Sequence, residues 1–306
     1  MTQVLLYWNH ICILQNKEKA FLEELTQRLL TEGIQLTVRY FGLGHPEHMS
    51  EYLARPDAVL PDIIVSADLE VYEDSRIYKK LAADLYPASQ WLELRQGAAL
   101  DAVRRGPELL PFTAIPLVYY TSDEGRDFQK PLWEMEGLAF GGINNSAVKT
   151  LVKAIWSKYG KEASDKLLKN GHVSDMPIGA FHQVRQGQRQ TALVPSLYAL
   201  RADGEKHFLR VPKEGPLLIP SFFCARRSIP EKTARRLAQA ILCPELCRFY
   251  AESGDLILYP ACNTLPSRQE GSTYLVPEPS WFENVSPEAF YAFYTKALPT
   301  ARDPFA

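Results

Sequence analysis

The sequence has no long apolar run and no secretion signal at its start. No apolar stretch approaches the ~20 residues that a membrane-spanning helix needs, which argues against a transmembrane protein. Met1 is followed almost at once by an expected strand, Val4 to Trp8, without the basic, then apolar, then small-residue order of a leader peptide. We therefore expect either a cytoplasmic protein or an exported one whose leader is missing from this sequence.

The sequence also lacks a large net charge of either sign, and its number of cysteines is odd. Its 34 basic and 36 acidic residues give a net charge of -2 with no long run of one sign, so we expect no nucleic-acid partner. Five cysteines, an odd number, argue against a fully disulfide-paired secreted protein. With 306 residues, 46% of them hydrophobic, the chain is long enough for two lobes that each bury a core.

Familiar catalytic motifs are missing as well. The sequence contains no G-x-S-x-G elbow, no P-loop, no G-x-G-x-x-G and no H-E-x-x-H. Isolated His, Asp and Ser residues are too common to be assigned to a triad. We therefore predict no catalytic residues, no resident cofactor and a role in binding.

The first third of the chain instead shows strands that end in polar residues. The strand from Val4 to Trp8 is followed by Asn9 and His10, and an amphipathic helix is expected from Lys17 to Glu32. A second strand, residues 34–40, ends in a loop that includes Gly44. This alternation of strand and helix predicts a doubly wound α/β sheet.

The stretch PDIIVSADLEV, residues 61–71, is the clearest of these strand ends. A buried β-branched run gives way to Ser66, Ala67 and Asp68. Ligands of open α/β sheets lie at the carboxyl ends of strands, so Ser66 and Asp68 are placed to hold a small molecule. The alternative is that Asp68 only caps the segment from Leu69 to Leu81.

The second half offers two further candidate binding segments. In FGGINN, residues 140–145, two glycines and Asn144 and Asn145 precede a helix that begins near Ser146, an arrangement that can hold an anion. The alternative is a plain N-cap with a glycine turn. A strand near residues 190–194 then ends in Ser196 and Tyr198.

Two expected strands contain proline, about a hundred residues apart. Thr113 to Thr121 includes Pro116, and Leu217 to Ala225 also carries a proline. Proline within a strand favours a sheet edge or a connection over a sheet centre. The pair is typical of two segments that pass between lobes.

The order of these features resembles the type II periplasmic-binding-protein-like family, the solute receptors of ABC importers. The resemblance runs from Val4 to Pro260 and is carried by these motifs: VLLYWNH, TEGIQLTV, PDIIVSADLEV, TAIPLVYYT, GGINNSA, QTALVPSLYAL and PKEGPLLIPSFFCARRSIPEKTARRLAQAIL. It implies two doubly wound lobes joined by crossover hinge strands, one formed by residues 1–114 and 222–270 and the other by residues 115–221 and 271–306. It also implies a monomer, located in the periplasm or at the cell surface, that works with the membrane subunits of an importer.

Carried over onto this sequence, the resemblance implies a solute-binding protein that captures a small polar or anionic ligand, or a metal ion, by hinge closure. The expected ligand-binding residues are Asn9, His10, Gly44, Ser66, Asp68, Asn144, Asn145, Ser146, Ser196 and Tyr198. Two alternatives stay open. One is an enzyme on the same scaffold, with chemistry of the thiamine-precursor type, and the other is a cytoplasmic ligand sensor.

Two groups of residues are candidate metal ligands. His10, His45 and His48 are neutral imidazoles near a carboxylate, which suits zinc or iron, although Gly-His-Pro-Glu-His is also ordinary loop and N-cap chemistry. YWNH is similar to the first-strand motif of ferric-iron receptors, but those carry adjacent tyrosines where only Tyr198 stands here. A possible cysteine cluster comprises Cys224, Cys243, Cys247 and Cys262. The alternative for these cysteines is burial as small apolar residues.

Overall fold

The computed structural model describes residues 1–11, 14–42, 45–259 and 273–298, and the chain divides into two structural units. The described residues of unit 1 fall within Met1–Ala114, Pro220–Glu252 and Leu256–Ser267. Those of unit 2 fall within Ile115–Ile219, Ser253–Asp255 and Arg268–Ala306. No helix in the described part of the chain is long and apolar enough to cross a membrane.

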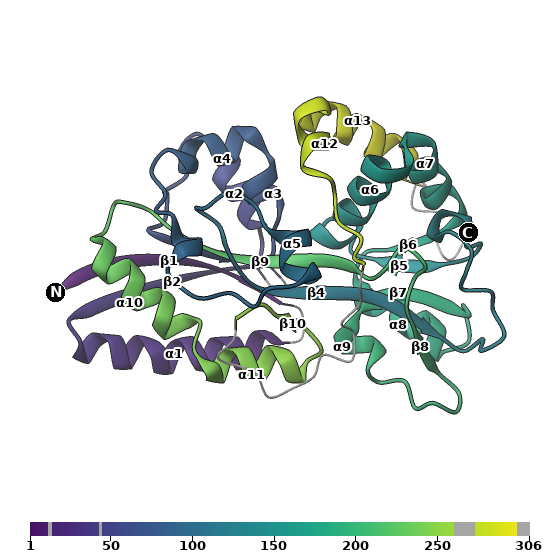
Figure 1. Ribbon diagram of the computed structural model, residues 1–306, viewed down its shortest axis with the longest axis horizontal. Coiled ribbons are helices and arrows are strands. Elements are labelled where there is room, and N and C mark those ends of the chain that lie inside the picture. Colours follow the sequence, from purple (N-terminus) through teal and green to yellow (C-terminus); the bar gives the residue numbers. More distant parts are fainter. Residues whose placement is uncertain (12–13, 43–44, 260–272, 299–306) are drawn as a thin grey trace. The chain divides into compact units, whose positions relative to one another are not determined.

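Unit 1 is built on a sheet whose parallel strands are ordered β2-β1-β3, followed by the antiparallel β9. Its strands are β1 (Thr2–His10), β2 (Ile34–Gly42), β3 (Ile63–Ser66) and β10 (Leu256–Ile257), with parts of β4 (Leu110–Thr121) and β9 (Leu217–Ala225). Its helices are α1 (Gln15–Thr31), α2 (Met49–Ala54), α3 (Glu70–Glu73), α4 (Ser75–Ala82), α5 (Ala98–Val103), α10 (Glu231–Ile241) and α11 (Pro244–Glu252). In Figure 1, α1, α10 and α11 lie on one face of this sheet, and α2, α3 and α4 lie on the other.

The apolar stripe of α1 explains how that helix packs on its face of the sheet. Leu22, Leu25 and Leu29 are buried at helical spacing. Gly33 follows the helix with φ of +82°, a conformation that side chains other than glycine rarely adopt, and turns the chain directly into β2. The expected helix and the strands on either side of it are confirmed.

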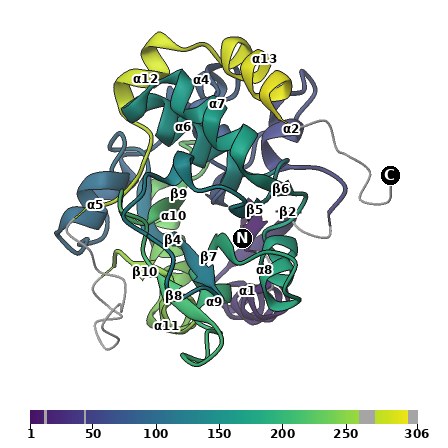
Figure 2. The same cartoon turned by 90° about the vertical axis from the view of Figure 1, so that its right-hand side faces the viewer.

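In the part of the sheet that belongs to unit 2, β7 lies between β4 and β5, and β6 follows β5. Its remaining strands are β5 (Ala139–Gly141), β6 (His172–Ser174), β7 (Thr191–Pro195) and β8 (Phe208–Arg210). Its helices are α6 (Ser146–Tyr159), α7 (Lys161–Asn170), α8 (Pro177–Arg185), α9 (Ser196–Ala199), α12 (Pro279–Asn284) and α13 (Pro287–Ala297). Helices α6 and α7 lie on one face of this sheet and α8 and α9 on the other (Figures 1 and 2).

The two proline-containing strands, β4 and β9, each contribute residues to both units. Every residue of both strands is buried. Because β4 pairs with β10, β7 and β8, its proline does not mark a sheet edge, but the strand does pass from one unit into the other, which was the other expectation for a proline-containing strand. Pro116 pairs with neither β10 nor β7, because it lies between Ala114, which pairs with β10, and Leu117, the first residue paired with β7.

Candidate functional site

His10 is the last residue of β1 and the most informative side chain of the candidate site. The strand is longer than expected, so Asn9 and His10 belong to it rather than follow it. Parallel pairing places His10 beside Gly42, the last residue of β2. The imidazole is buried, and its Nδ1 atom lies 2.7 Å from Oε2 of Glu18 in the first turn of α1.

The Glu18 carboxylate joins three elements of unit 1. Glu18 is fully buried. Besides its contact with His10, its carboxylate accepts hydrogen bonds from the Tyr250 hydroxyl of α11 at 2.6 Å and from the Ile11 backbone N–H at 3.1 Å. Sequence reasoning did not single out Glu18 or Tyr250. A signal for Glu18 was present, because it occupies the position four residues before Leu22 on the otherwise apolar stripe of α1.

The second ring nitrogen of His10, Nε2, is in a different environment from Nδ1. Nε2 is buried and has no hydrogen-bond partner among the residues that the structure describes. The ring stacks on Tyr40 with centroids 4.8 Å apart and planes 8° apart, and lies near His45 with centroids 5.6 Å apart and planes 20° apart. Nε2 of His45 is also buried, and it has no hydrogen-bond partner within the described ranges. Burial lowers the pKa of His45, and the nearby His10 and Lys19 lower it further. The site therefore carries two imidazole nitrogens that the described protein groups do not use.

Gly42 allows the ends of β1 and β2 to approach closely. Its φ is +94°, and a Cβ atom there would lie 3.0 Å from both the Asn9 Nδ2 atom and the His10 carbonyl oxygen. Any larger residue would push these groups apart. Gly44, which the sequence places in the same loop, lies outside the described residues.

Ser66 and Asp68 follow in the same unit but are engaged within the protein. The Ser66 hydroxyl accepts the backbone N–H of Asp68 at 2.9 Å, and Asp68 Oδ2 accepts the backbone N–H of Ser50, in the first turn of α2, at 2.9 Å. Both side chains are buried. Asp68 is not the N-cap of the helix after it, because α3 follows Leu69 and has no side-chain cap, while the Asp68 carboxylate accepts from the first turn of α2, 18 residues earlier.

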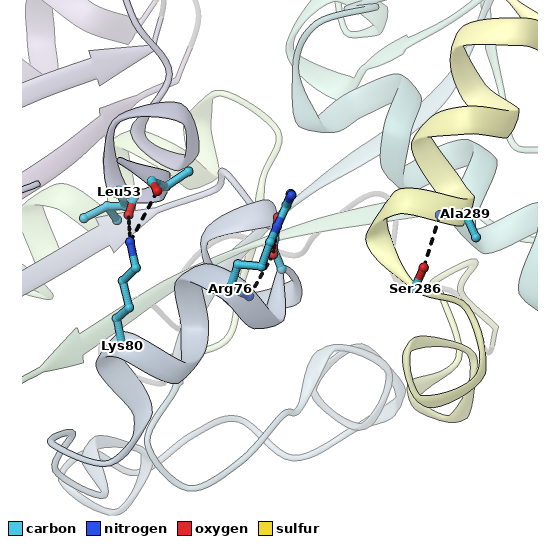
Figure 3. A network of polar contacts seen from close by, with 7 residues as sticks. Leu53, Arg76, Lys80, Ser286 and Ala289 are labelled. Atoms are coloured by element: carbon cyan, nitrogen blue, oxygen red, sulfur yellow. Dashed lines mark hydrogen bonds and ion pairs between the residues drawn. The ribbon is translucent and has the colours of Figure 1, made fainter. Parts of the chain in front are cut away.

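Helix α2 is fixed at both of its ends. The side chain of His48 accepts from the backbone at the third helical residue, while Glu51 accepts the His48 backbone N–H at 3.1 Å. Figure 3 shows Lys80 reaching the other end of α2, where it donates to the carbonyl oxygens of Leu53 at 3.0 Å and Arg55 at 3.1 Å. His48 is thus a capping residue.

The described residues contain no group of three or more His, Cys, Asp or Glu side chains arranged to hold a metal ion. The predicted set of His10, His45 and His48 is therefore not gathered into one ligand group. Cys224, Cys243 and Cys247 are free thiols, and burial raises the pKa of Cys224 to about 12, so its thiol stays protonated and unreactive. Cys262 lies outside the described residues.

In unit 2, the glycine-rich segment forms the start of α6. Asn145 caps the helix, its side-chain oxygen accepting the Ala147 backbone N–H at 2.9 Å. A Cβ atom at Gly141 would overlap the Met176 carbonyl oxygen, so close packing requires glycine there. Asn144 is exposed and Ser146 is half-buried at this helix start.

Ser196 and Tyr198 are packed inside unit 2. The Ser196 hydroxyl donates to the Gly254 carbonyl oxygen at 2.9 Å. Tyr198 is only 2% exposed and lies in an apolar cluster with Val194 and Phe181, whose ring centroid is 5.5 Å away. Both side chains therefore stabilise the packing of unit 2.

Comparisons with known proteins define the fold. No protein-family model matches the sequence, and no curated protein matches it. Solved structures do match over nearly the whole chain. Iron-bound HitA of Pseudomonas aeruginosa is 16% identical with a TM-score of 0.69, covering 97% of this chain and 99% of its own.

Two other solved structures extend the comparison to different cargoes. A periplasmic thiamin binding protein is 13% identical with a TM-score of 0.66, covering 97% and 96% of the two chains. The spermidine/putrescine substrate-binding protein PotD of Streptococcus pneumoniae is 14% identical with a TM-score of 0.62, covering 97% of both. This chain therefore has the fold of type II periplasmic binding proteins, which confirms the expected fold class.

Proposed function

We propose that this protein is the solute-binding component of an ABC-type importer, which captures a small polar solute or a metal ion and does not transform it. The fold supports the proposal, because solved proteins that share it are described as binding iron, thiamin or polyamines. In this role the chain would act outside the membrane and deliver its solute to membrane subunits.

The observation that carries the proposal is the buried Nε2 atom of His10, for which the described part of the chain supplies no hydrogen-bond partner. Buried polar atoms of proteins nearly always have a partner, so one without a partner at the carboxyl end of a strand is a candidate ligand contact. We propose that His10 and Asn9 contact the solute in unit 1. Asn144 and Ser146, at the start of α6, remain proposed contacts within unit 2. Ser66, Asp68, Asn145, Ser196 and Tyr198 shape these segments through the internal contacts described above.

A thermal-shift screen tests the proposal. The panel comprises metal ions, oxyanions, amino acids, sugars, polyamines and vitamin precursors. A solute present at a hundred times its dissociation constant stabilises a protein by about 2.7 kcal/mol, which such a screen resolves. We expect one class of solute to raise the melting temperature and to be recovered unchanged.

The same screen with His10→Gln locates the solute. We expect the shift to be lost in this variant and kept in His182→Gln, which changes an exposed histidine of α8. Solute-dependent closure of the two units should also lower the radius of gyration in small-angle scattering. A solute that is consumed, or silence across the whole panel, would contradict the proposed function.

A further inference from the structure

We propose that Glu18 and Tyr250 are positioning residues that hold His10 as the Nδ1–H tautomer and so present the lone pair of Nε2 to the solute. This inference rests on the proposed function and adds the chemical class of the solute. The group that meets His10 is a metal ion or an N–H or O–H donor, and not an anion.

The contacts of Glu18 place the first proton. Its two oxygens lie within hydrogen-bond distance of the Tyr250 hydroxyl, the Ile11 backbone N–H and Nδ1 of His10. An ionised carboxylate only accepts hydrogen bonds, and three surrounding donors match that capacity. The proton between Glu18 and His10 therefore belongs to Nδ1, as it does in carboxylate–histidine pairs that orient metal ligands.

The surroundings of Nε2 leave that atom without a proton. A proton on Nε2 would be a buried donor with no acceptor among the described residues, which proteins rarely tolerate. A ring whose one proton lies on Nδ1 has its donor paired with Glu18 and leaves no unpartnered donor at Nε2.

Packing holds the ring in this orientation. Tyr40 covers one face of the imidazole at a centroid distance of 4.8 Å, while Glu18 fixes its Nδ1 edge at 2.7 Å. The side chain of His10 is fully buried, so rotation would break the contact with Glu18 and move the ring off Tyr40. A fixed neutral lone pair attracts metal ions and hydrogen-bond donors and repels anions.

Nitrogen NMR of the histidine-labelled full chain tests the inference without requiring a solute. The sequence has six histidines, and His10→Gln assigns the signals of residue 10 by their loss. We expect the parent spectrum to show Nδ1 protonated and Nε2 unprotonated at neutral pH. Glu18→Gln should mix the two tautomers, whereas Glu23→Gln, an exposed change on the same helix, should not.

Zn²⁺ and sulfate are then titrated as paired probes of Nε2. We expect Zn²⁺ to move the Nε2 signal and sulfate to leave it, and we expect Glu18→Gln to weaken Zn²⁺ binding by about 10- to 100-fold. A protonated Nε2 in the parent, a tautomer unchanged by Glu18→Gln, or a response to sulfate alone would overturn the inference. If the tautomer is as expected but neither probe moves the signal, the positioning role stands and the proposed solute contact fails.

Discussion

Replacing Glu18 by alanine should destabilise unit 1 strongly. The change removes the acceptor for three donors, His10 Nδ1–H, the Tyr250 hydroxyl and the Ile11 backbone N–H. Each buried donor left without a partner costs about 1–3 kcal/mol. Water can enter part of the space that the side chain leaves, so we expect a total loss of about 3–5 kcal/mol in the free energy of unfolding, the range for breaking a buried charged pair.

Two further variants separate the contributions to that loss. Tyr250→Phe removes one hydrogen bond to a charged group and keeps the ring, so we expect a loss of about 2 kcal/mol. Because both changes remove the same contact, the double variant should lose less than the sum of the single losses. The matched control is Glu23→Ala, whose side chain is 65% exposed and should change stability by less than about 0.5 kcal/mol.

The assay is urea unfolding followed by tryptophan fluorescence and by circular dichroism. Trp8 lies in unit 1 on the strand that carries His10, so its signal reports the affected unit. The two units can unfold in separate transitions, and the loss should appear in the transition that Trp8 reports. A loss below about 1 kcal/mol for Glu18→Ala would refute the reasoning, because the network would then contribute little more than one ordinary hydrogen bond.

Three further predictions follow from the described contacts. Gly141→Ala should lower stability by about 1–3 kcal/mol in denaturant unfolding, since the new Cβ would overlap the Met176 carbonyl oxygen, whereas no loss would refute that packing. Asn145→Ala should cost about 1 kcal/mol by loss of the α6 cap, while Asn145→Asp should keep most of it. Burial lowers the pKa of His45 below 6.5, so the unfolded chain takes up this proton first and stability should fall as pH drops below that value. His45→Gln should flatten the melting-temperature profile there, and an identical profile would contradict the assignment.

Local sequence patterns were enough to predict the first helix of the chain and the strands β1, β2 and β3. The β-branched run before Ser66 and the apolar stripe of α1 each depend on neighbours a few residues apart, and both were confirmed. The same local pattern predicted that His10 lies where β1 ends, but placed it just after the strand rather than as its last residue.

The contacts that decide the role of each candidate residue could not be predicted in this way. Glu18 meets Tyr250 across 232 residues, and Asp68 caps a helix that begins before it in the chain. Tyr198 follows a strand, as a binding residue would, but its ring packs into the core of unit 2. In each case tertiary packing, which one sequence does not reveal, determines whether a polar atom is used by the protein or left for a ligand.

The most direct test of the central claim is calorimetric titration of the solute found by screening into the parent, His10→Gln and His182→Gln, with the solute recovered and analysed afterwards. We predict saturable binding in the parent and His182→Gln, a large loss of affinity in His10→Gln, and a chemically unchanged solute. Equal affinity in all three proteins, or a transformed solute, would contradict the account of His10 as a solute contact in a binding protein.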